Sequence, residues 1–555
     1  MTGAERVWRE LKQLGMDTVF GVPGGAVLPL VDALSTYQDV PFVVTRHESA
    51  AIHAADGYAR ASGKPGVALV TSGPGGTNSL TGLMTAMTDS TPLVVLVGQV
   101  PTTLIGTDAF QEADLFTMAM SVVKHSWKVE RADDVGTVIR EAYALATTGR
   151  PGPVLVEFPK DVQLALEQNG APVSDAARVT ASTRFELSPT MRARLRAYFG
   201  RARRPLLYVG GGVVSSGTEH WIRLWSERYD APVTTTLLGL GAFPADHPHA
   251  LGMLGMHGTY AANHAIQEAD LILALGVRFD DRVTGRVDRF APKARIIHVE
   301  IDQAEHNKLV RPDVTIPGDL RSVLPVLDSF IPQAYHNEWM STIRMWQKEH
   351  PLRIPSAPVG HLSSPEVLVE LSAALHDEDV VVTDVGQHQM WAALFVKRNR
   401  PRRFLTSGGA GTMGYGLPAA IGAQMAVRDD KVVLIAGDGS FQMNLQELAT
   451  VSQYRIPIVI MVMNNGGHGM VRQWQDLFHG KRRHGVALTN PDFVELARVF
   501  GIRGMTVESP DQLREALAHL HEIEGPLLLE VKVDPNEMVF PMVPAGQSLS
   551  EMIEE

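Results

Sequence analysis

Apolar segments of strand length alternate with helical patterns along almost the whole chain, and this alternation limits the possible fold more than any other feature. The first apolar segments are residues 41–45, 66–73, 92–99 and 152–159. Between them lie stretches with helical spacing of apolar residues, such as "ESAAIHAADGYARA" and "NSLTGLMTAMTD". Strands that are apolar on both faces and separated by helices are typical of parallel sheets covered on both sides. We therefore predict an α/β protein with doubly wound parallel sheets.

The chain is too long for one hydrophobic core. Domains usually hold about 100–200 residues, so the 555 residues predict three or so domains. Two polar stretches, 167–189 and 348–365, interrupt the alternation and are typical of linkers. The predicted sections are three α/β domains at 1–165, 190–335 and 365–535, followed by a C-terminal tail at 536–555.

The charge and the lack of cysteine exclude several classes of protein. A net charge of -11 argues against nucleic acid or an acidic membrane surface as the main partner. Without cysteine there is no disulfide, thiolate metal site or cysteine nucleophile, which fits a cytoplasmic protein. Residues 1–21 predict an amphipathic helix and a strand rather than a signal peptide, and no apolar run approaches the roughly 18 residues that a membrane span needs.

The segment "KVVLIAGDGSFQMN" at 431–444 ends an apolar strand on a carboxylate. Asp438 lies between Gly437 and Gly439, and burial of this charge without a partner would cost on the order of several kcal/mol. The next apolar run ends in Asn464 and Asn465. Ligands bind at the carboxyl ends of strands in open α/β sheets, and an all-oxygen set of side chains suits Mg²⁺. The glycines would let backbone N–H groups approach a phosphate.

Each half of this pattern is weak by itself, because a lone Gly-Asp-Gly is usually an ordinary turn. The combination is more specific. A spacer of 24 residues separates Gly439 from Asn464, and each half follows an apolar strand. This spacing resembles the thiamine diphosphate (ThDP) motif, and enzymes of that class need a glutamate beside the aminopyrimidine ring of the cofactor.

Glu48 is the candidate for that glutamate. An apolar stripe continues from it along one face of the predicted helix, at Ala51, Ile52, Ala55 and Ala59. By itself, Glu48 would be interpreted as a helix N-terminal carboxylate that faces the helix dipole at the surface. The Asp438 and Asn465 pattern in the same chain favours the catalytic interpretation.

Longer stretches resemble one enzyme family in collinear order over essentially the whole chain. They include "GVPGGAVLPLVDAL" at 21–34, "GVRFDDRVTG" at 276–285, "SGGAGTMGYGLPAAIGA" at 407–423 and "GMVRQWQ" at 469–475. The chain resembles the catalytic large subunit of acetohydroxyacid synthase (acetolactate synthase). The resemblance implies a thiamine-diphosphate-binding fold with a pyrimidine-binding domain, a central FAD-associated domain and a diphosphate-binding domain.

The resemblance also implies roles for residues around the cofactor. Glu48 would lie on the pyrimidine ring, and Met413 would bend ThDP into its reactive shape. Mg²⁺ would be bound by Asp438, Asn465 and the carbonyl of Gly467. The other implied ThDP contacts are Gly24, Gly25, Gln387, His388, Gly437, Gly439, Ser440, Met443 and Met470.

The implied reaction decarboxylates pyruvate and joins the remaining two-carbon unit to a second pyruvate or to 2-ketobutyrate. The products, 2-acetolactate and 2-aceto-2-hydroxybutyrate, belong to the first common step of branched-chain amino-acid biosynthesis. Arg282 would bind the acceptor's carboxylate bidentately, although alone it would be interpreted as a surface ion pair with a neighbouring aspartate. Trp474 would favour 2-ketobutyrate, a preference that one methylene limits to about 10–200-fold. Phe110, Gln111 and Lys160 match further active-site positions.

A flavin is implied only by the resemblance, because the strand that runs into glycines at 203–217 is weak evidence for a dinucleotide by itself. Carboligation transfers no net electrons, so the FAD would be structural. The implied contacts are Gly211, Gly212, Met253, His257, Arg278, Asp302 and Asp319.

Two alternatives remain open. One is another ThDP and FAD enzyme, such as a pyruvate oxidase or a glyoxylate carboligase, and the other is a non-catalytic cofactor-binding paralogue. The carboligase has an apolar residue in place of the glutamate, so Glu48 argues against it. The resemblance also implies a homodimer or homotetramer with sites at the subunit interface, and a small regulatory subunit as a possible partner.

The segment "NNGGHGM" after the second strand departs from the family, which carries larger residues there. We expect the extra glycines to increase the entropy lost when this loop is ordered, by ~1 kcal/mol each, and to weaken ThDP retention. His468 is either a neutral loop histidine or a source of pH dependence near ~6.5.

Overall fold

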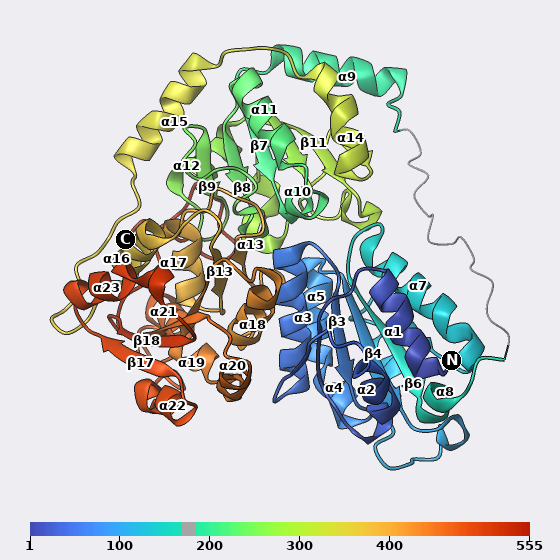
Figure 1. Ribbon diagram of the computed structural model, residues 1–555. Helices are drawn as coiled ribbons and strands as arrows, with labels where there is room; N and C mark the ends of the chain where they lie inside the picture. The colour runs from blue at the N-terminus through green and yellow to red at the C-terminus, as the bar shows by residue number, and fades with distance from the viewer. Residues whose placement is uncertain (169–184) are drawn as a thin grey trace.

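The computed structural model describes residues 1–168 and 185–555 and contains three six-stranded sheets (Figure 1). Every strand pairs in parallel with its neighbours, so the predicted class, three doubly wound parallel sheets, is confirmed. The strand orders are β2-β1-β3-β4-β6-β5, β12-β11-β10-β7-β8-β9 and β14-β13-β15-β16-β18-β17.

The strand bounds follow the apolar segments of the sequence. The first sheet contains β1 (Val19–Val22), β2 (Phe42–Val44), β3 (Gly66–Val70), β4 (Leu93–Gln99), β5 (Ser126–Lys128) and β6 (Pro153–Pro159). The second sheet contains β7 (Pro205–Val209), β8 (Val233–Thr235), β9 (Ala250–Met253), β10 (Leu271–Leu275), β11 (Arg295–Glu300) and β12 (Val314–Pro317). The third sheet contains β13 (Val380–Thr383), β14 (Phe404–Leu405), β15 (Val432–Gly437), β16 (Val459–Asn464), β17 (Arg503–Val507) and β18 (Leu527–Lys532).

Helices connect the strands of each sheet. The first domain has α1 (Gly3–Gln13), α2 (Leu28–Leu34), α3 (Glu48–Ser62), α4 (Pro74–Asn78), α5 (Leu80–Asp89), α6 (Leu115–Ala119), α7 (Val135–Thr147) and α8 (Lys160–Leu164). The second domain has α9 (Pro189–Arg201), α10 (Gly211–Ser216), α11 (Glu219–Tyr229), α12 (Tyr260–Glu268), α13 (Asp281–Thr284), α14 (Leu320–Leu327) and α15 (Asn337–Glu349). The third domain has α16 (Ser364–Ala374), α17 (Gln387–Phe395), α18 (Gly416–Ala426), α19 (Asp438–Phe441), α20 (Leu448–Tyr454), α21 (Gly469–Phe478), α22 (Phe493–Val499) and α23 (Pro510–Ala518).

In each sheet the direction of strand addition reverses beside the first strand of that sheet. In the first sheet, β2 and β3 flank β1, in the second, β8 and β10 flank β7, and in the third, β14 and β15 flank β13. In open α/β sheets, ligands bind beyond the carboxyl ends of the strands at such a reversal. The topology therefore predicts one ligand-binding position in each domain, between β1 and β3, between β7 and β10, and between β13 and β15.

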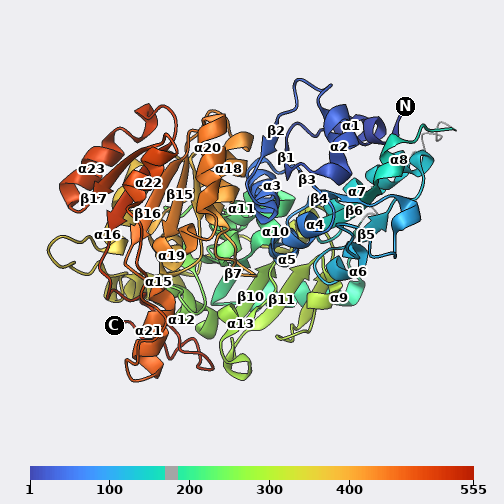
Figure 2. The same cartoon turned by 90° about the horizontal axis from the view of Figure 1, so that it is seen from below.

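The first and third domains share one hydrophobic core, which is centred on α3 and α18. Figures 1 and 2 both show these helices side by side between the two sheets. Two glycines permit the contact. A Cβ atom on Gly57 would lie 2.1 Å from the carbonyl oxygen of Ala419, and one on Gly422 would lie 1.8 Å from that of Ala54. Both distances are far below any real contact, so only glycine fits at these positions.

The C-terminal segment 536–555 is packed rather than free. Val539, Met542 and Leu549 are buried, and an antiparallel bridge joins Met542 to Ile553. The backbone N–H of Val543 donates to the carbonyl of Met256, which ties the segment to the second domain. Most of the polar segment 167–189 lies outside the described residues. Among the helices that the structure describes, none is long and apolar enough to cross a membrane.

Candidate functional site

A cavity in the third domain lies at the reversal between β13 and β15. It brings together ten of the predicted site residues, which are Gln387, His388, Met413, Gly437, Asp438, Gly439, Ser440, Asn465, Gly467 and Met470. Among the described residues, those that line it all lie between Ser364 and Val533. The third domain by itself therefore forms this cavity.

Asp438 is the most buried charge in the cavity. It begins α19 directly after β15, and the residue is 1% exposed. Its Oδ2 atom accepts a hydrogen bond from Nδ2 of Asn490 at 2.7 Å. Burial raises the pKa of the Asp438 carboxyl above its usual value, and the Asn490 hydrogen bond opposes that rise. A carboxylate of this kind is suited to bind a cation.

Two further oxygen donors follow β16. The backbone N–H of Gly467 donates to Oδ1 of Asn465 at 3.1 Å, which folds the chain so that both residues line the cavity. Together with Asp438 they provide a carboxylate, a side-chain amide and a backbone carbonyl. This all-oxygen set matches the preference of Mg²⁺, which usually shares its coordination with phosphate oxygens.

Two side chains at the start of α17 are held in fixed orientations. Burial lowers the pKa of His388 to about 3, so its ring is neutral near physiological pH. Its Nε2 atom accepts the backbone N–H of Gly437 at 3.2 Å, which places the ring proton on the other nitrogen. Gln387 donates through Nε2 to Oε1 of Gln473 at 2.9 Å. The Oε1 atom of Gln387 also accepts a hydrogen bond from Nδ2 of Asn465 at 3.4 Å, so α17 contacts both segments that carry the oxygen donors.

Sequence reasoning missed the residue that holds the Met413 turn. Asp384 follows β13 and is fully enclosed. Its Oδ1 atom accepts the N–H of Gly414 and its Oδ2 atom that of Gly416, both at 2.9 Å. Burial raises the pKa of the Asp384 carboxyl to about 6, although these hydrogen bonds oppose the rise. The sequence did carry one signal for Asp384, which is its position directly after an apolar strand and close to Gln387 and His388.

The glycines after Asn465 are required by the local backbone, which corrects our expectation that they simply loosen the loop. Gly466 has a φ of +68°, a conformation that larger residues adopt only with strain. A Cβ on Gly467 would lie 2.3 Å from the carbonyl of Val486, because an antiparallel bridge joins Gly467 to Ala487. His468 lines the cavity and packs against Gly439. This loop is therefore tied to residues 486–488 and cannot accept larger residues without a backbone shift.

The first domain supplies a separate group of predicted residues at its own reversal, between β1 and β3. Glu48 begins α3 and is partly exposed, and its Oε2 atom accepts a hydrogen bond from Nδ2 of Asn78 at 2.9 Å. Gly24 follows β1, where a Cβ would lie 2.6 Å from the side chain of Thr71. Gly25 begins the short turn of helix after it. None of these described residues lines the third-domain cavity of the same chain.

Three other predicted residues lie elsewhere in the first domain. Gln111 has a φ of +60° and contacts Gly73, close to the start of α4. Phe110 beside it is 88% exposed, which is unusual for so large an apolar side chain. Lys160 begins α8 after β6. The structure places these residues outside the third-domain cavity.

The predicted substrate residues are also dispersed in a single chain. Arg282 lines a small cavity with Val543, Pro544 and other residues of the C-terminal segment. Its Nε atom lies 3.8 Å from Oδ2 of Asp281, but both side chains are well exposed, so this pair contributes little to stability. Trp474 lies on α21, where its ring is 5.1 Å from that of Phe478. Met443 is 51% exposed.

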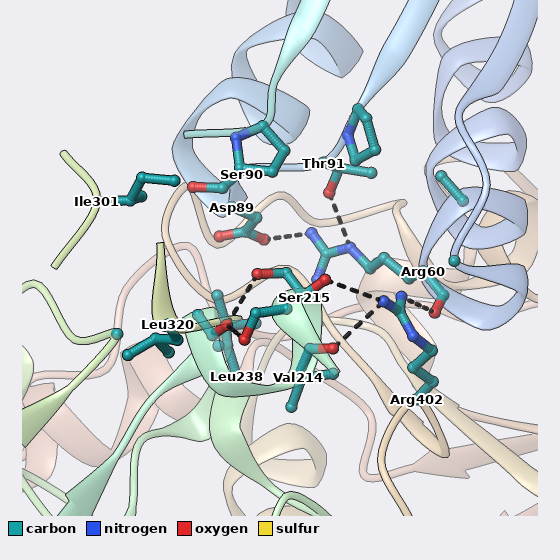
Figure 3. Close-up of a pocket in the computed structure, with 18 of the residues that line it drawn as sticks. Arg60, Asp89, Ser90, Thr91, Val214, Ser215, Leu238, Ile301, Leu320 and Arg402 are labelled. Carbon is teal, nitrogen blue, oxygen red and sulfur yellow. Dashed lines mark hydrogen bonds and ion pairs between the residues drawn. The ribbon is translucent and has the colours of Figure 1, made fainter. Parts of the chain in front are cut away.

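A second cavity lies where all three domains meet (Figure 3). Gly211, Gly212 and Asp319 of the predicted flavin set line it. The first domain contributes Arg60, whose Nη2 atom contacts Asp89 at 2.7 Å, and the third domain contributes Arg402. Met253, His257, Arg278 and Asp302 do not line this cavity, and Asp302 instead pairs with Arg150 at 3.2 Å.

A group of possible metal ligands lies at the opposite, amino end of the third sheet. His376, Asp379 and His521 offer ligand atoms within 4.8 Å of one another. The two imidazole rings are stacked, however, with centroids 3.6 Å apart and planes 9° apart. The lone pairs of a ring nitrogen lie in the ring plane, so two stacked rings cannot both direct them at one ion. Asp379 instead accepts the backbone N–H groups of His376 and Lys431, which fixes the starts of β13 and β15.

Comparison with known proteins assigns the three domains to one family. The thiamine pyrophosphate enzyme N-terminal TPP binding domain matches residues 1–120, the central domain matches 193–327 and the C-terminal TPP binding domain matches 384–531. The acetolactate synthase isozyme 2 large subunit of Escherichia coli (strain K12) is 47% identical over 100% of both chains. The chain belongs to the acetolactate synthase family of thiamine-diphosphate enzymes.

Other members of the acetolactate synthase family are similar over the full length of the chain. The acetolactate synthase large subunit of Parasynechococcus marenigrum (strain WH8102) is 45% identical over 100% of this chain and 91% of its own length. The mitochondrial acetolactate synthase catalytic subunit of Saccharomyces cerevisiae is 42% identical over 100% of this chain and 84% of its own length. The resemblance predicted from the sequence is therefore confirmed.

The third-domain cavity fits a magnesium-bound diphosphate in its donor chemistry. The buried carboxylate of Asp438 and the two neutral oxygens of Asn465 and Gly467 are the kinds of donor that Mg²⁺ prefers, and the glycines beside Asp438 keep side chains away from them. A Cβ on Gly437 would collide with His388 at 2.8 Å, so the backbone itself lines this part of the cavity. Such an exposed backbone is what an anionic phosphate group requires.

The cavity between the domains fits a dinucleotide. It lies at the reversal of the second sheet, where the glycine turn after β7 meets the end of β10, and a Cβ on Gly212 would lie 2.6 Å from the Cα of Gly276. Glu300 and Asp319 provide carboxylates near the ends of β11 and β12. A glycine-rich turn at the reversal with acidic residues on neighbouring strands is the arrangement that binds a diphosphate and a ribose.

Proposed function

We propose that the protein is an acetolactate synthase that uses ThDP, Mg²⁺ and a structural FAD. It forms 2-acetolactate from two pyruvates, or 2-aceto-2-hydroxybutyrate from pyruvate and 2-ketobutyrate, as the first common step of branched-chain amino-acid biosynthesis. The observation that carries this proposal is the presence in one chain of the Asp438, Asn465 and Gly467 oxygen set and of Glu48 on a separate domain. Full-length identity to acetolactate synthase large subunits supports it.

In this function the third-domain cavity holds the cofactor. Asp438, Asn465 and Gly467 would bind Mg²⁺, and Gln387, His388 and the backbone at Gly437–Ser440 would contact the diphosphate. Met413 would support the bent cofactor, since Asp384 fixes its turn through two backbone N–H groups. Bound thiamine diphosphate supplies a nucleophilic carbon and an electron sink for the decarboxylation of a 2-keto acid. The residues of the protein would orient that cofactor and transfer protons to and from it.

Glu48 would exchange a proton with the aminopyrimidine ring through its carboxyl oxygens. Asn78 already holds one of these oxygens at 2.9 Å, which orients the carboxyl group. Arg282 would bind the carboxylate of the second substrate through its guanidinium, and its present pairing with Asp281 is too weak to prevent this. Trp474 would line the space for the acceptor's alkyl group, and Phe110, Gln111 and Lys160 would complete the substrate site.

A second copy of the chain would bring the two halves of the site together. Glu48 does not line the third-domain cavity of its own chain, so a complete site needs a first domain from another chain. The side chains of Phe110, Met118 and Met120 are 88%, 50% and 66% exposed in the first domain, and monomers rarely expose so many large apolar side chains together. We infer a homodimer, or a homotetramer built from it, with two shared sites.

A small regulatory subunit is a further partner, because the relatives are called large subunits. The FAD would occupy the cavity between the three domains, where Gly211, Gly212 and Asp319 support its binding. Its role would be structural, because joining two keto acids with loss of CO₂ leaves no electrons to transfer. The flavin would thus hold the three domains in a fixed arrangement.

A single assay tests this function against its rivals. The purified protein is mixed with ThDP, Mg²⁺, FAD and pyruvate, and 2-acetolactate is measured while the flavin absorbance is followed. We expect acetolactate with an unbleached flavin. Bleaching of the flavin on addition of pyruvate would indicate an oxidase. Acetaldehyde as the main product, or no product from cofactor-loaded protein, would also contradict the proposal.

A further inference from the structure

Glu447 makes an unusual set of contacts across the interface between the third and first domains. It ends a short 3-10 helix, Leu445–Glu447, and is fully buried. Its Oε1 atom accepts the backbone N–H of Arg46 at 2.9 Å and that of His47 at 3.1 Å. Its Oε2 atom accepts the hydroxyl of Thr450 at 2.6 Å. A carboxylate of the third domain therefore holds two consecutive peptide groups of the first domain.

The two peptide groups are those that lead into α3. Arg46 and His47 directly precede Glu48, the first residue of that helix, and His47 is its N-cap. The Nδ1 atom of His47 accepts the backbone N–H of Ser49 at 3.1 Å, which closes the cap. Since two successive N–H groups are fixed, the peptide planes before Glu48 have little freedom to rotate. The direction in which the Glu48 side chain leaves the backbone is then set by Glu447.

We propose that Glu447 is a positioning residue for Glu48. It holds the N–H groups of Arg46 and His47 and so aims the carboxyl group that serves the cofactor. This inference rests on the proposed function, in which Glu48 exchanges a proton with the cofactor. A displacement of about 1 Å from the reactive geometry is enough to lower a rate by about 100-fold, so a clamp at this position matters for the reaction.

Glu447 differs from a second side-chain contact between the same two domains in the peptide groups that it holds. Burial raises the pKa of the Glu447 carboxyl, and the hydrogen bonds from Thr450, Arg46 and His47 oppose that rise. The same interface has a neutral contact that joins the same two domains. The hydroxyl of Tyr454 accepts the N–H of Val44 at 2.9 Å and donates to the carbonyl of Phe42 at 3.1 Å. Tyr454 is thus a matched control that anchors β2 without holding the peptides next to Glu48.

The test compares Glu447→Ala, Glu447→Gln and Tyr454→Phe with wild type in two measurements. The first is amide hydrogen exchange of peptides that cover residues 42–52 in the cofactor-free protein. The second is kcat and KM for acetolactate formation from pyruvate at saturating ThDP, Mg²⁺ and FAD. We expect Glu447→Ala to speed exchange at residues 46–50 and to lower kcat by about 10- to 100-fold, with little change in KM.

The conservative variants separate positioning from stability. Glu447→Gln retains one oxygen that can accept the N–H groups of Arg46 and His47, so we expect it to recover much of kcat. Tyr454→Phe should lower the melting temperature but leave kcat within about twofold of wild type. If kcat is unchanged in Glu447→Ala, the inference is wrong. It is equally wrong if both Glu447→Ala and Tyr454→Phe lose kcat in proportion to their loss of melting temperature.

The two measurements also separate this inference from the proposed function. If the wild type forms no acetolactate, the proposed function fails. Hydrogen exchange then decides whether Glu447 holds the start of α3, and unchanged exchange at residues 46–50 in Glu447→Ala would overturn that too. If the wild type is active but Glu447→Ala is equally active, only the positioning role fails.

Discussion

The crossing of α3 and α18 gives the most stringent prediction from the fold. In Gly422→Ala, the new Cβ would lie 1.8 Å from the carbonyl oxygen of Ala54, 2.6 Å from its carbon and 2.9 Å from the N atom of Tyr58. All three atoms belong to the backbone of a buried helix, so none can move alone. Real Cβ contacts are essentially never shorter than 3.0 Å, so the two helices must move apart by more than 1 Å.

The free energy of unfolding should therefore fall. Overpacking of this kind costs about 1–3 kcal/mol and sometimes more, and the close approach puts Gly422→Ala at the upper end. Alanine has a better helix propensity than glycine, which offsets about 1 kcal/mol of this cost. We expect a net loss of about 2 kcal/mol, or a decrease of several degrees in melting temperature. Because α3 begins at Glu48, the same displacement should lower kcat by about 10-fold or more.

The assays are thermal unfolding and steady-state acetolactate formation, with Gly200→Ala as the matched control. Gly200 is also helical, in α9, but a Cβ there would have no atom within 4 Å. Gly200→Ala should retain wild-type activity and be as stable as the wild type or more stable by up to about 1 kcal/mol. Gly57→Ala, whose Cβ would lie 2.1 Å from the carbonyl oxygen of Ala419, should behave like Gly422→Ala. If Gly422→Ala has the melting temperature and kcat of the wild type, our account of this crossing is wrong.

Three further predictions concern the third domain. Asp438→Asn should raise the dissociation constant of Mg²⁺, measured in the presence of ThDP, by at least about tenfold without lowering the melting temperature of cofactor-free protein. An unchanged constant would refute its role as a ligand. The pKa of Asp384 is raised to about 6, so its contribution to stability is complete below pH 3.8 and is lost as the pH rises through about 6. Asp384→Asn should therefore show a smaller loss of melting temperature between roughly pH 4 and 7 than the wild type, and an identical profile would contradict this. Gly466→Ala should raise the dissociation constant of ThDP by about fivefold or more, because φ is +68° at this position. Gly525→Ala is the control: φ is +74° there, a Cβ would meet no atom within 4 Å, and the dissociation constant should not change. Equal dissociation constants for Gly466→Ala and wild type would contradict the prediction that alanine strains this loop.

The parts of the site that the sequence could predict are local in the chain. Asp438 and Asn465 each follow an apolar strand, and strands that pair in parallel bring their carboxyl ends to the same edge of a sheet. The order of β13, β15 and β16 in the structure is what this reasoning requires. Glu48 begins a helical pattern, but it became a candidate only through the Asp438 and Asn465 pattern in the same chain.

The parts that the sequence could not predict depend on contacts between distant segments. Asp384 accepts N–H groups from residues 30 and 32 positions later, and Glu447 accepts one from a residue 401 positions earlier. Neither partner is marked by its side chain, because the donors are backbone groups that every residue except proline carries. The roles of Gly57 and Gly422 also could not be recognised from the sequence, because each glycine is needed only where the other helix packs against it.

Residue patterns alone did not indicate that Glu48 and the oxygen set lie apart in one chain; only the family resemblance implied sites at a subunit interface. Both belong to the same predicted active site, yet the described residues that line the third-domain cavity come from one domain only. The division follows from the topology, because each domain forms its own ligand position at its own strand reversal. In the proposed function, these two halves would meet through a second copy of the chain.

Complementation between two inactive variants tests this central claim most directly. Glu48→Gln and Asp438→Asn are each expected to form no measurable acetolactate from pyruvate. When the two are co-expressed with different tags and purified together, random pairing gives half heterodimers with one intact site each, so about a quarter of the wild-type rate should return. If the mixture stays inactive while wild-type dimers form and catalyse normally, the site does not join Glu48 of one chain to Asp438 of another.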